Sequence, residues 1–195
     1  WSMEELELFF KTGRNNIAAA FGAMADVVQH STQYYSDDDI GALSAYLKRL
    51  PPVKDKLQSF SNKTDTTTAA LLTRNNPGSL GAIVYMQYCV TCHRADGKGI
   101  ARIFPALAGN SAIYARNPQS VIQIVLEGGR MPHTKYDRMA FAMPGFAQLS
   151  DDQILAVINF IRNGWTNQAS DIEYKDIQHM RQFLGGKAVN TNTPQ

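Results

Sequence analysis

Residues 88–93 contain the side chains best suited to do chemistry: two cysteines one helical turn apart, followed at once by a histidine. They form the C-x-x-C-H pattern that is typical of covalent haem attachment. Two thiols at this spacing add to the two vinyl groups on one edge of a porphyrin, and the histidine then lies under the iron as its proximal ligand. The pattern therefore predicts one covalent haem c, with its iron, bound through Cys89 and Cys92 and with His93 as one axial ligand.

The same motif fits two plainer interpretations, a redox-active dithiol and half of a zinc site. A zinc site needs about four ligands, and the chain has no cysteines besides these two. A thioredoxin-like dithiol follows a strand within a βαβ pattern. Here Leu80, Val84, Tyr85 and Tyr88 recur at helical spacing up to the motif, which predicts a helix before it. Both alternatives are therefore disfavoured.

A sixth iron ligand, methionine or histidine, is expected downstream, on a loop that reaches the opposite face of the haem. Four residues could supply it: Met131, His133, Met139 and Met143. Met143 is favoured because a ligand loop has to be pinned, and Pro144 restricts the residue before it to an extended conformation. His133 and Met131 remain the main alternatives.

The elements that position these residues are expected to be helices. Ser150 is a good N-cap, and the acidic pair Asp151–Asp152 suits the first turn of a helix. Ile154, Ile158 and Ile161 then give that helix a buried face. Because no alternating strand pattern of useful length occurs, we predict an all-α fold with small helices around the haem.

The composition excludes several classes of protein. The chain has 195 residues, of which 44% are hydrophobic and 18% charged, as in globular proteins. Its formal net charge of +2 gives no reason to expect nucleic-acid binding. No run of about 18 apolar residues occurs, so no membrane span is expected in this chain. It begins at Trp1 without a secretory leader, and we expect the longer gene product to supply one.

Three further segments carry a resemblance to a known family: Phe104–Asn110, Ala142–Pro144 and the closing helix up to Trp165. Together with the haem motif they resemble a small class I cytochrome c domain. More narrowly, they are similar to the last haem domain of the three-haem cytochrome c subunit of membrane-bound periplasmic dehydrogenases, which oxidise alcohols, aldehydes, gluconate or related polyols. The resemblance covers nearly the whole chain.

The resemblance implies several contacts at the haem site. Pro105 should offer its carbonyl to the Nδ1–H of His93, a contact that orients a ligating imidazole. Gly81 and Tyr85 on the first helix should cross Phe160 on the last. Arg130, which follows a Gly-Gly turn, is expected to pair with a haem propionate.

The first fifty residues repeat the second half of this domain without its haem motif. Leu6–Arg14 aligns with Ile122–Arg130, and Ser36–Lys48 aligns with Ser150–Arg162. We therefore expect residues 1–52 to be the C-terminal half of a preceding cytochrome c domain. The remaining boundaries are then a linker at 53–76, the haem domain at 77–166, and a C-terminal helix with a loose tail at 167–195.

Met24 lies between the two repeated blocks, where Met143 lies in the intact domain. We expect Met24 to be the sixth ligand of a different haem, bound upstream of Trp1, and not to ligate the haem of the C-x-x-C-H motif. Without its own haem, the half-domain has to pack on the intact domain or on a second chain in a dimer.

Function is expected to follow from the coordination of the iron. An iron with both axial positions filled, by His93 and Met143, has no site for substrate or oxygen, which leaves one-electron transfer without enzymatic chemistry. The resemblance implies a relay from a periplasmic dehydrogenase subunit to quinone or to a downstream cytochrome or oxidase, in the periplasm or at the periplasmic face of the inner membrane. A free-standing soluble electron shuttle is the alternative. A five-coordinate haem enzyme or gas sensor is less favoured.

Overall fold

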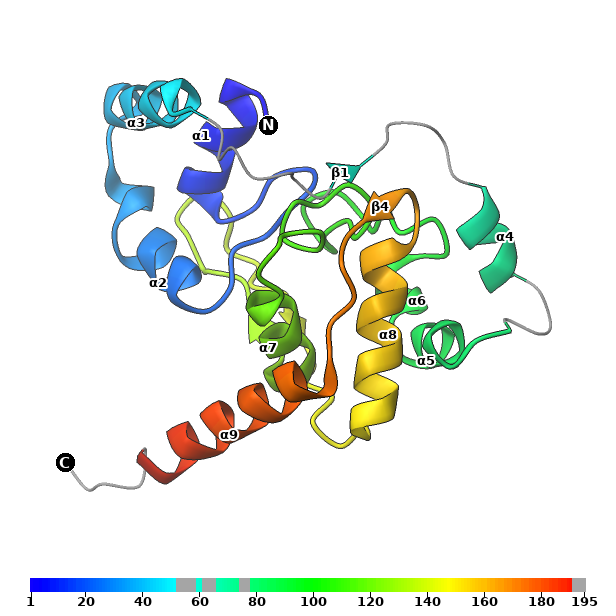
Figure 1. Ribbon diagram of the computed structural model, residues 1–195. Helices are drawn as coiled ribbons and strands as arrows, with labels where there is room; N and C mark the ends of the chain where they lie inside the picture. Colours follow the sequence, from blue (N-terminus) through cyan, green and yellow to red (C-terminus); the bar gives the residue numbers. More distant parts are fainter. Residues whose placement is uncertain (52–58, 61–65, 74–77, 191–195) are drawn as a thin grey trace.

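Short helices make up most of the protein, whose computed structural model describes residues 1–51, 59–60, 66–73 and 78–190. In Figure 1 the first three helices gather on one side of the molecule, and the helices around the haem motif lie on the other. The elements in chain order are α1 (Met3–Thr12), α2 (Ala23–His30), the 3₁₀ turn η1 (Thr32–Tyr34), α3 (Asp37–Arg49), β1 (Ser59–Phe60), α4 (Thr67–Leu72), α5 (Leu80–Tyr88), α6 (Val90–His93), α7 (Gln119–Glu127), β2 (Gly129–Arg130), β3 (Ala142–Met143), α8 (Asp151–Asn163), β4 (Asn167–Gln168) and α9 (Tyr174–Asn190).

Strands within the described ranges are limited to two antiparallel pairs, each two residues long. β1 pairs with β4, and β2 pairs with β3. The second pair places Met143 opposite Gly129, so it ties the expected ligand to the end of α7. The predicted all-α class is confirmed.

The closing helix α8 starts where the sequence predicts. The Ser150 hydroxyl accepts a hydrogen bond from the Gln153 amide, and the Gln153 side chain accepts one from the Ser150 amide, which completes a capping box. Ile154 and Ile158 are fully buried, and Ile161 is nearly so. This face packs against α5, which leads directly into the haem motif.

The crossing of α5 and α8 depends on a glycine. A Cβ placed on Gly81 would lie 2.8 Å from the Cβ of Phe160, and closer still to the Ala156 carbonyl oxygen. The two backbones can therefore approach only because Gly81 has no side chain. One turn further on, the Tyr85 ring packs against Phe160 with a centroid distance of 5.6 Å, which is the crossing that the sequence predicts.

The described part of the half-domain, residues 1–51, has the same framework as the end of the haem domain. Ser36 caps α3 as Ser150 caps α8, and the bridge between Arg14 and Ala19 corresponds to the β2–β3 pair. In this register Ala20, whose amide donates to the Gly13 carbonyl, takes the position of Met143. Met24 lies further on, in the first turn of α2, because that helix lengthens the loop between the bridge and α3.

Part of the expected linker belongs to the haem domain. Leu72 of α4 is 3% exposed and lies in the main hydrophobic core, and the Thr68 hydroxyl accepts a hydrogen bond from the Trp165 amide. The core also contains Ile177 of α9. Leu71 also packs against this core, so α4, which falls within the expected linker, contacts the haem domain. The stretches 52–58, 61–65 and 74–77 lie outside the described residues.

The expected C-terminal helix is α9, which runs from Tyr174 to Asn190, and residues 191–195 of the expected tail lie outside the described residues. It packs on α7 and α8 through buried residues that include Ile177 and Met180. Within the described ranges, no helix is both long enough and apolar enough to cross a bilayer.

Candidate haem site

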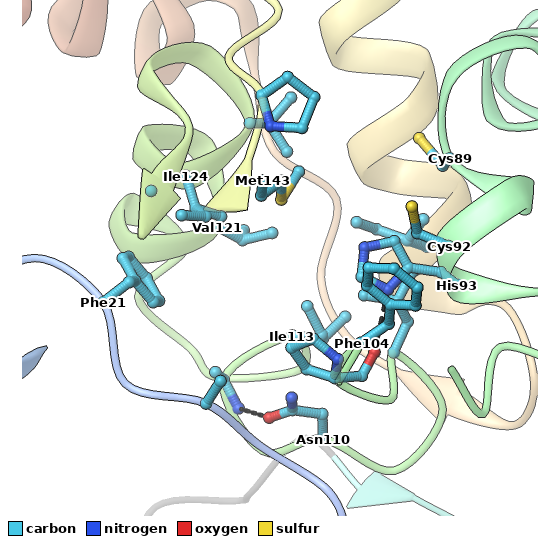
Figure 2. Close-up of a pocket in the computed structure, with 18 of the residues that line it drawn as sticks. Phe21, Cys89, Cys92, His93, Phe104, Asn110, Ile113, Val121, Ile124 and Met143 are labelled. Carbon is cyan, nitrogen blue, oxygen red and sulfur yellow. Dashed lines mark hydrogen bonds between the residues drawn. The ribbon is translucent and has the colours of Figure 1, made fainter. Parts of the chain in front are cut away.

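A deep apolar cavity lies between the haem motif and the end of α7. Figure 2 shows Cys89, Cys92 and His93 together on one side of it and Met143 on the opposite side. Val121 and Ile124 of α7 lie beside Met143. Most of the remaining lining is aliphatic or aromatic, including Val84, Phe104, Leu107, Ile113, Val125, Phe146, Leu149, Val157 and Ile161.

The two cysteines stand where α5 ends and α6 begins. The Cys89 amide donates to the Tyr85 carbonyl and so closes α5, and Cys92 falls within the single turn of α6. Both thiols are free and partly buried. Burial raises the pKa of the Cys89 thiol to about 12, and the neighbouring Cys92 adds to the rise. The cavity wall therefore presents two free thiols at the spacing that thioether attachment requires.

His93 is oriented through its Nδ1 atom. That atom lies 2.9 Å from the Pro105 carbonyl oxygen, and since a carbonyl can only accept, Nδ1 carries the proton. Burial lowers the pKa of His93, and the hydrogen bond to Pro105 opposes this only in part. The imidazole is therefore neutral near pH 7, and Nε2 is the nitrogen left to ligate a metal.

Of the four candidates for the sixth ligand, the structure places two in the cavity wall, Met131 and Met143. The Met131 sulfur accepts a hydrogen bond from Arg14 at 3.5 Å. His133 is exposed, with its Nδ1 atom 2.9 Å from the Arg138 carbonyl, and Met139 is 64% exposed at the surface.

Two hydrogen bonds from aromatic side chains hold the backbone that follows the haem motif. The Tyr85 hydroxyl donates to the Arg94 carbonyl at 2.7 Å, just beyond His93, and the Trp165 indole N–H donates to the Ala95 carbonyl at 2.8 Å. Tyr85 lies on α5 and Trp165 lies just after α8, so both helices are bonded to the residues that follow the motif. The sequence predicts the meeting of the helices but not these two bonds.

Gly99 is a site residue that the sequence reasoning missed. It has a φ of +58°, and a Cβ on it would collide with the Phe104 carbonyl oxygen and lie 2.7 Å from that of Pro105. Only glycine lets the chain come this close, and the approach presents the Pro105 carbonyl to His93. The pair of glycines at 97 and 99, directly after the motif, is the signal that could have identified it.

The half-domain supplies part of the cavity wall. Residues 18–21 line the cavity, and the Ile17 carbonyl accepts hydrogen bonds from the Ala106 amide at 3.0 Å and from the Asn110 side chain at 3.4 Å. The half-domain therefore packs on the intact domain of the same chain through residues 17–21. Arg130 lies at the margin of the cavity with its side chain exposed.

The residues present fit a haem c. Thioether attachment needs two thiols in a fixed relation, and axial ligation needs an imidazole with a free Nε2 and a soft thioether opposite, all around an apolar slot. The cavity provides each of these groups. In the described part of the chain, no group of three or more His, Cys, Asp or Glu side chains is placed to hold a metal ion, as a zinc site would require.

Comparison with known proteins bears on this site directly. The family model for cytochrome c matches residues 79–165, which include the whole motif and the closing helix. Cytochrome c-552 of Thermus thermophilus is 36% identical over 89 residues, which are 44% of this chain and 67% of that protein. The chain belongs to the cytochrome c family. A cytochrome c domain implies a covalent haem c with its iron.

Two longer relatives extend the similarity beyond the cytochrome c domain. The cytochrome c subunit of the quinone-dependent alcohol dehydrogenase of Gluconobacter oxydans is 43% identical over 183 residues, which are 93% of this chain and 38% of that subunit. The cytochrome c subunit of gluconate 2-dehydrogenase of Pantoea cypripedii is 39% identical over 184 residues, which are 93% of this chain and 41% of that subunit. The chain thus spans about two fifths of the length of these relatives.

Proposed function

We propose that this chain transfers single electrons and carries out no substrate chemistry of its own. In this proposal one haem c is held by Cys89 and Cys92, with His93 and Met143 as its axial ligands. The observation that carries the proposal is the layout of the cavity, with two thiols and an imidazole on one wall, a thioether on the other and apolar side chains between them. The chain has one C-x-x-C-H motif, so one haem is proposed.

Each group in the chain has a defined task in this scheme. When bound, haem c supplies a one-electron couple, and ligation by histidine and methionine favours a relatively high potential. Pro105 holds the imidazole of His93 in the tautomer that leaves Nε2 for the iron. The β2–β3 pair holds Met143, and the apolar lining excludes water.

Met143 is proposed as the ligand in preference to Met131 on two grounds. Its backbone is pinned by the pairing with Gly129, and Figure 2 shows it across the cavity from His93. The Met131 sulfur is already engaged by the Arg14 guanidinium. Arg130 is proposed as the partner of a propionate because its cation is exposed at the margin of the cavity.

The longer relatives suggest where the electrons come from. One is a subunit of an alcohol dehydrogenase and the other of a gluconate 2-dehydrogenase, and this chain matches each over 93% of its length. We therefore propose that a dehydrogenase subunit is the electron donor and that quinone or a downstream cytochrome or oxidase is the acceptor. Because haem c is attached outside the cytoplasm, the proposed location is the periplasm or its membrane face. Residues 1–52 are proposed to be the end of a preceding cytochrome c domain.

The ligand set is tested with the haem-loaded ferric protein. Methionine-ligated ferric haem shows a weak band in the red that other ligands do not give. Met143→Ala should abolish this band and lower the midpoint potential, whereas the matched variant Met131→Ala should keep the band. Loss of the band in Met131→Ala alone would move the ligand to Met131. If the wild-type protein lacks the band and binds carbon monoxide as isolated, a five-coordinate haem enzyme or sensor would be favoured.

A further inference from the structure

The loop between β2 and β3, residues 131–141, is held along its length by the half-domain. The backbone amide of His133 donates to the Gln29 side chain at 3.0 Å, and that of Lys135 donates to the Gln33 side chain at 2.8 Å. In Figure 1 this yellow-green loop lies beside α1 and α2. Gln29 belongs to α2 and Gln33 to η1, which follows it in the chain, so consecutive turns of one segment bind alternate amides of the loop.

Arg14 is the centre of this contact. Its side chain is 2% exposed and makes a two-pronged ion pair with Asp137, through Nε at 2.6 Å and through Nη2. The guanidinium also stacks on the Phe141 ring, with 5.2 Å between the guanidinium carbon and the ring centroid. Its third nitrogen donates to the Met131 sulfur. One buried cation thus contacts the start, the middle and the end of the loop.

The loop leads directly to the proposed iron ligand. The Met131 amide donates to the Phe141 carbonyl at 2.9 Å, which closes the loop next to the β2–β3 pair. Phe141 is two residues before Met143, and both line the cavity. The loop is therefore joined directly to the backbone that carries Met143. Near the start of the loop, Pro132 packs on Gly13 so closely that a Cβ there would overlap its ring.

We propose that Arg14, assisted by Gln29 and Gln33, is a clamp by which the half-domain determines how firmly Met143 holds the iron. Arg14 is a positioning residue, since it acts through the loop and not on the haem. The proposal rests on the proposed ligation by Met143 but goes beyond it. The intact domain contains its own attachment motif and both ligands, yet part of the control over one ligand is supplied by the neighbouring domain.

The charges around Arg14 predict that Arg14→Gln and Arg14→Lys loosen the loop to different extents. Asp137 also pairs with Arg102 at 2.8 Å, so it retains one partner when Arg14 is removed. Arg14→Gln should therefore free the loop without leaving a bare carboxylate. Arg14→Lys keeps the charge but loses the two-pronged bond and the stacking on Phe141, so it should be intermediate.

The test measures how fast imidazole displaces Met143 in the haem-loaded ferric chain, followed by loss of the methionine–iron band. Arg14→Gln should speed displacement at least tenfold, the Gln29→Ala/Gln33→Ala double variant should speed it less, and Arg14→Lys should lie between Arg14→Gln and the wild type. Arg49→Gln, at the exposed end of α3 in the same half-domain, is the matched control and should be unchanged. Hydrogen exchange at the His133 and Lys135 amides should rise together with the displacement rate.

The outcomes separate the two proposals. A wild-type chain that shows the band, with Arg14→Gln displaced at the same rate as Arg49→Gln, would overturn the clamp and leave the ligation intact. A wild-type chain without the band would overturn the ligation and the clamp together. If Arg14→Gln fails to take up haem, the double variant and Arg14→Lys decide: displacement at the wild-type rate in both would equally overturn the clamp.

Discussion

Adding a single methyl group at Gly81 should weaken the fold through the helix crossing that positions the haem motif. In Gly81→Ala the new Cβ would lie 2.8 Å from the Phe160 Cβ and closer still to the Ala156 carbonyl oxygen, so α5 and α8 would have to separate by about 1 Å. Neither neighbour is a flexible chain end, so relief has to come from moving backbone. Overpacking of this kind costs about 1–3 kcal/mol.

Helix propensity alone would make Gly81→Ala stabilising, so the sign of the change in the free energy of unfolding is informative. Alanine is preferred to glycine inside a helix by about 1 kcal/mol. Because the clash is with backbone, we expect the upper part of the overpacking range and a net loss of about 2 kcal/mol. For a chain of this size, that corresponds to a melting temperature about 4–8 °C lower.

Gly41 provides a control glycine on α3, the helix of the half-domain that corresponds to α8. Its new Cβ would meet only the end of the Glu7 side chain, at 3.9 Å. Gly41→Ala should therefore raise the free energy of unfolding by about 0.5–1 kcal/mol. Urea denaturation of the haem-loaded protein, followed by circular dichroism, measures both variants. Equal stabilisation by both substitutions would refute the close crossing at Gly81.

Three further changes test other parts of the structure. Arg162→Met should lower the free energy of unfolding in urea by about 3 kcal/mol, because the buried guanidinium donates to three main-chain carbonyls that would lose their partner. Ser44→Ala should raise it by about 1 kcal/mol, since the Ser44 hydroxyl is buried without a hydrogen-bond partner among the described residues; a loss of stability would point to a partner. Burial raises the pKa of Asp137, but bonds and charge from Arg14 and Arg102 outweigh this and hold the pKa below its ordinary value of 3.8. A lowered pKa stabilises the fold above that value, so the stability difference between wild type and Asp137→Asn should shrink as pH falls below about 4 and stay constant from pH 5 to 7.

The sequence was most informative where the contacts are local. The haem motif lies within five consecutive residues, and the start of α8 lies within four, so their patterns can be read directly. The expectation that Met143 is the sixth ligand rests on local features too, the proline after it and the helix beyond, and it stays a prediction. The repeat in the first fifty residues predicted the framework of α1 and α3.

Contacts between segments far apart in the sequence could not be predicted from local patterns. Arg14 and Asp137 are 123 residues apart, and Ile17 and Asn110 are 93 apart, so spacing gives no hint that they meet. The alignment of the half-domain with the haem domain could not be predicted either. The additional helix α2 places Met24 beyond the position that corresponds to Met143. These contacts depend on how two repeats pack, which is decided by shape and by buried charge.

The most direct test of the central claim is mass spectrometry of the tryptic peptide spanning residues 75–94, from protein produced in a host that exports it and attaches haem. The peptide contains both cysteines and His93. It should carry one haem that survives denaturation, and no other peptide of the chain should carry any. A peptide found unmodified, with both thiols open to alkylation, would contradict the account.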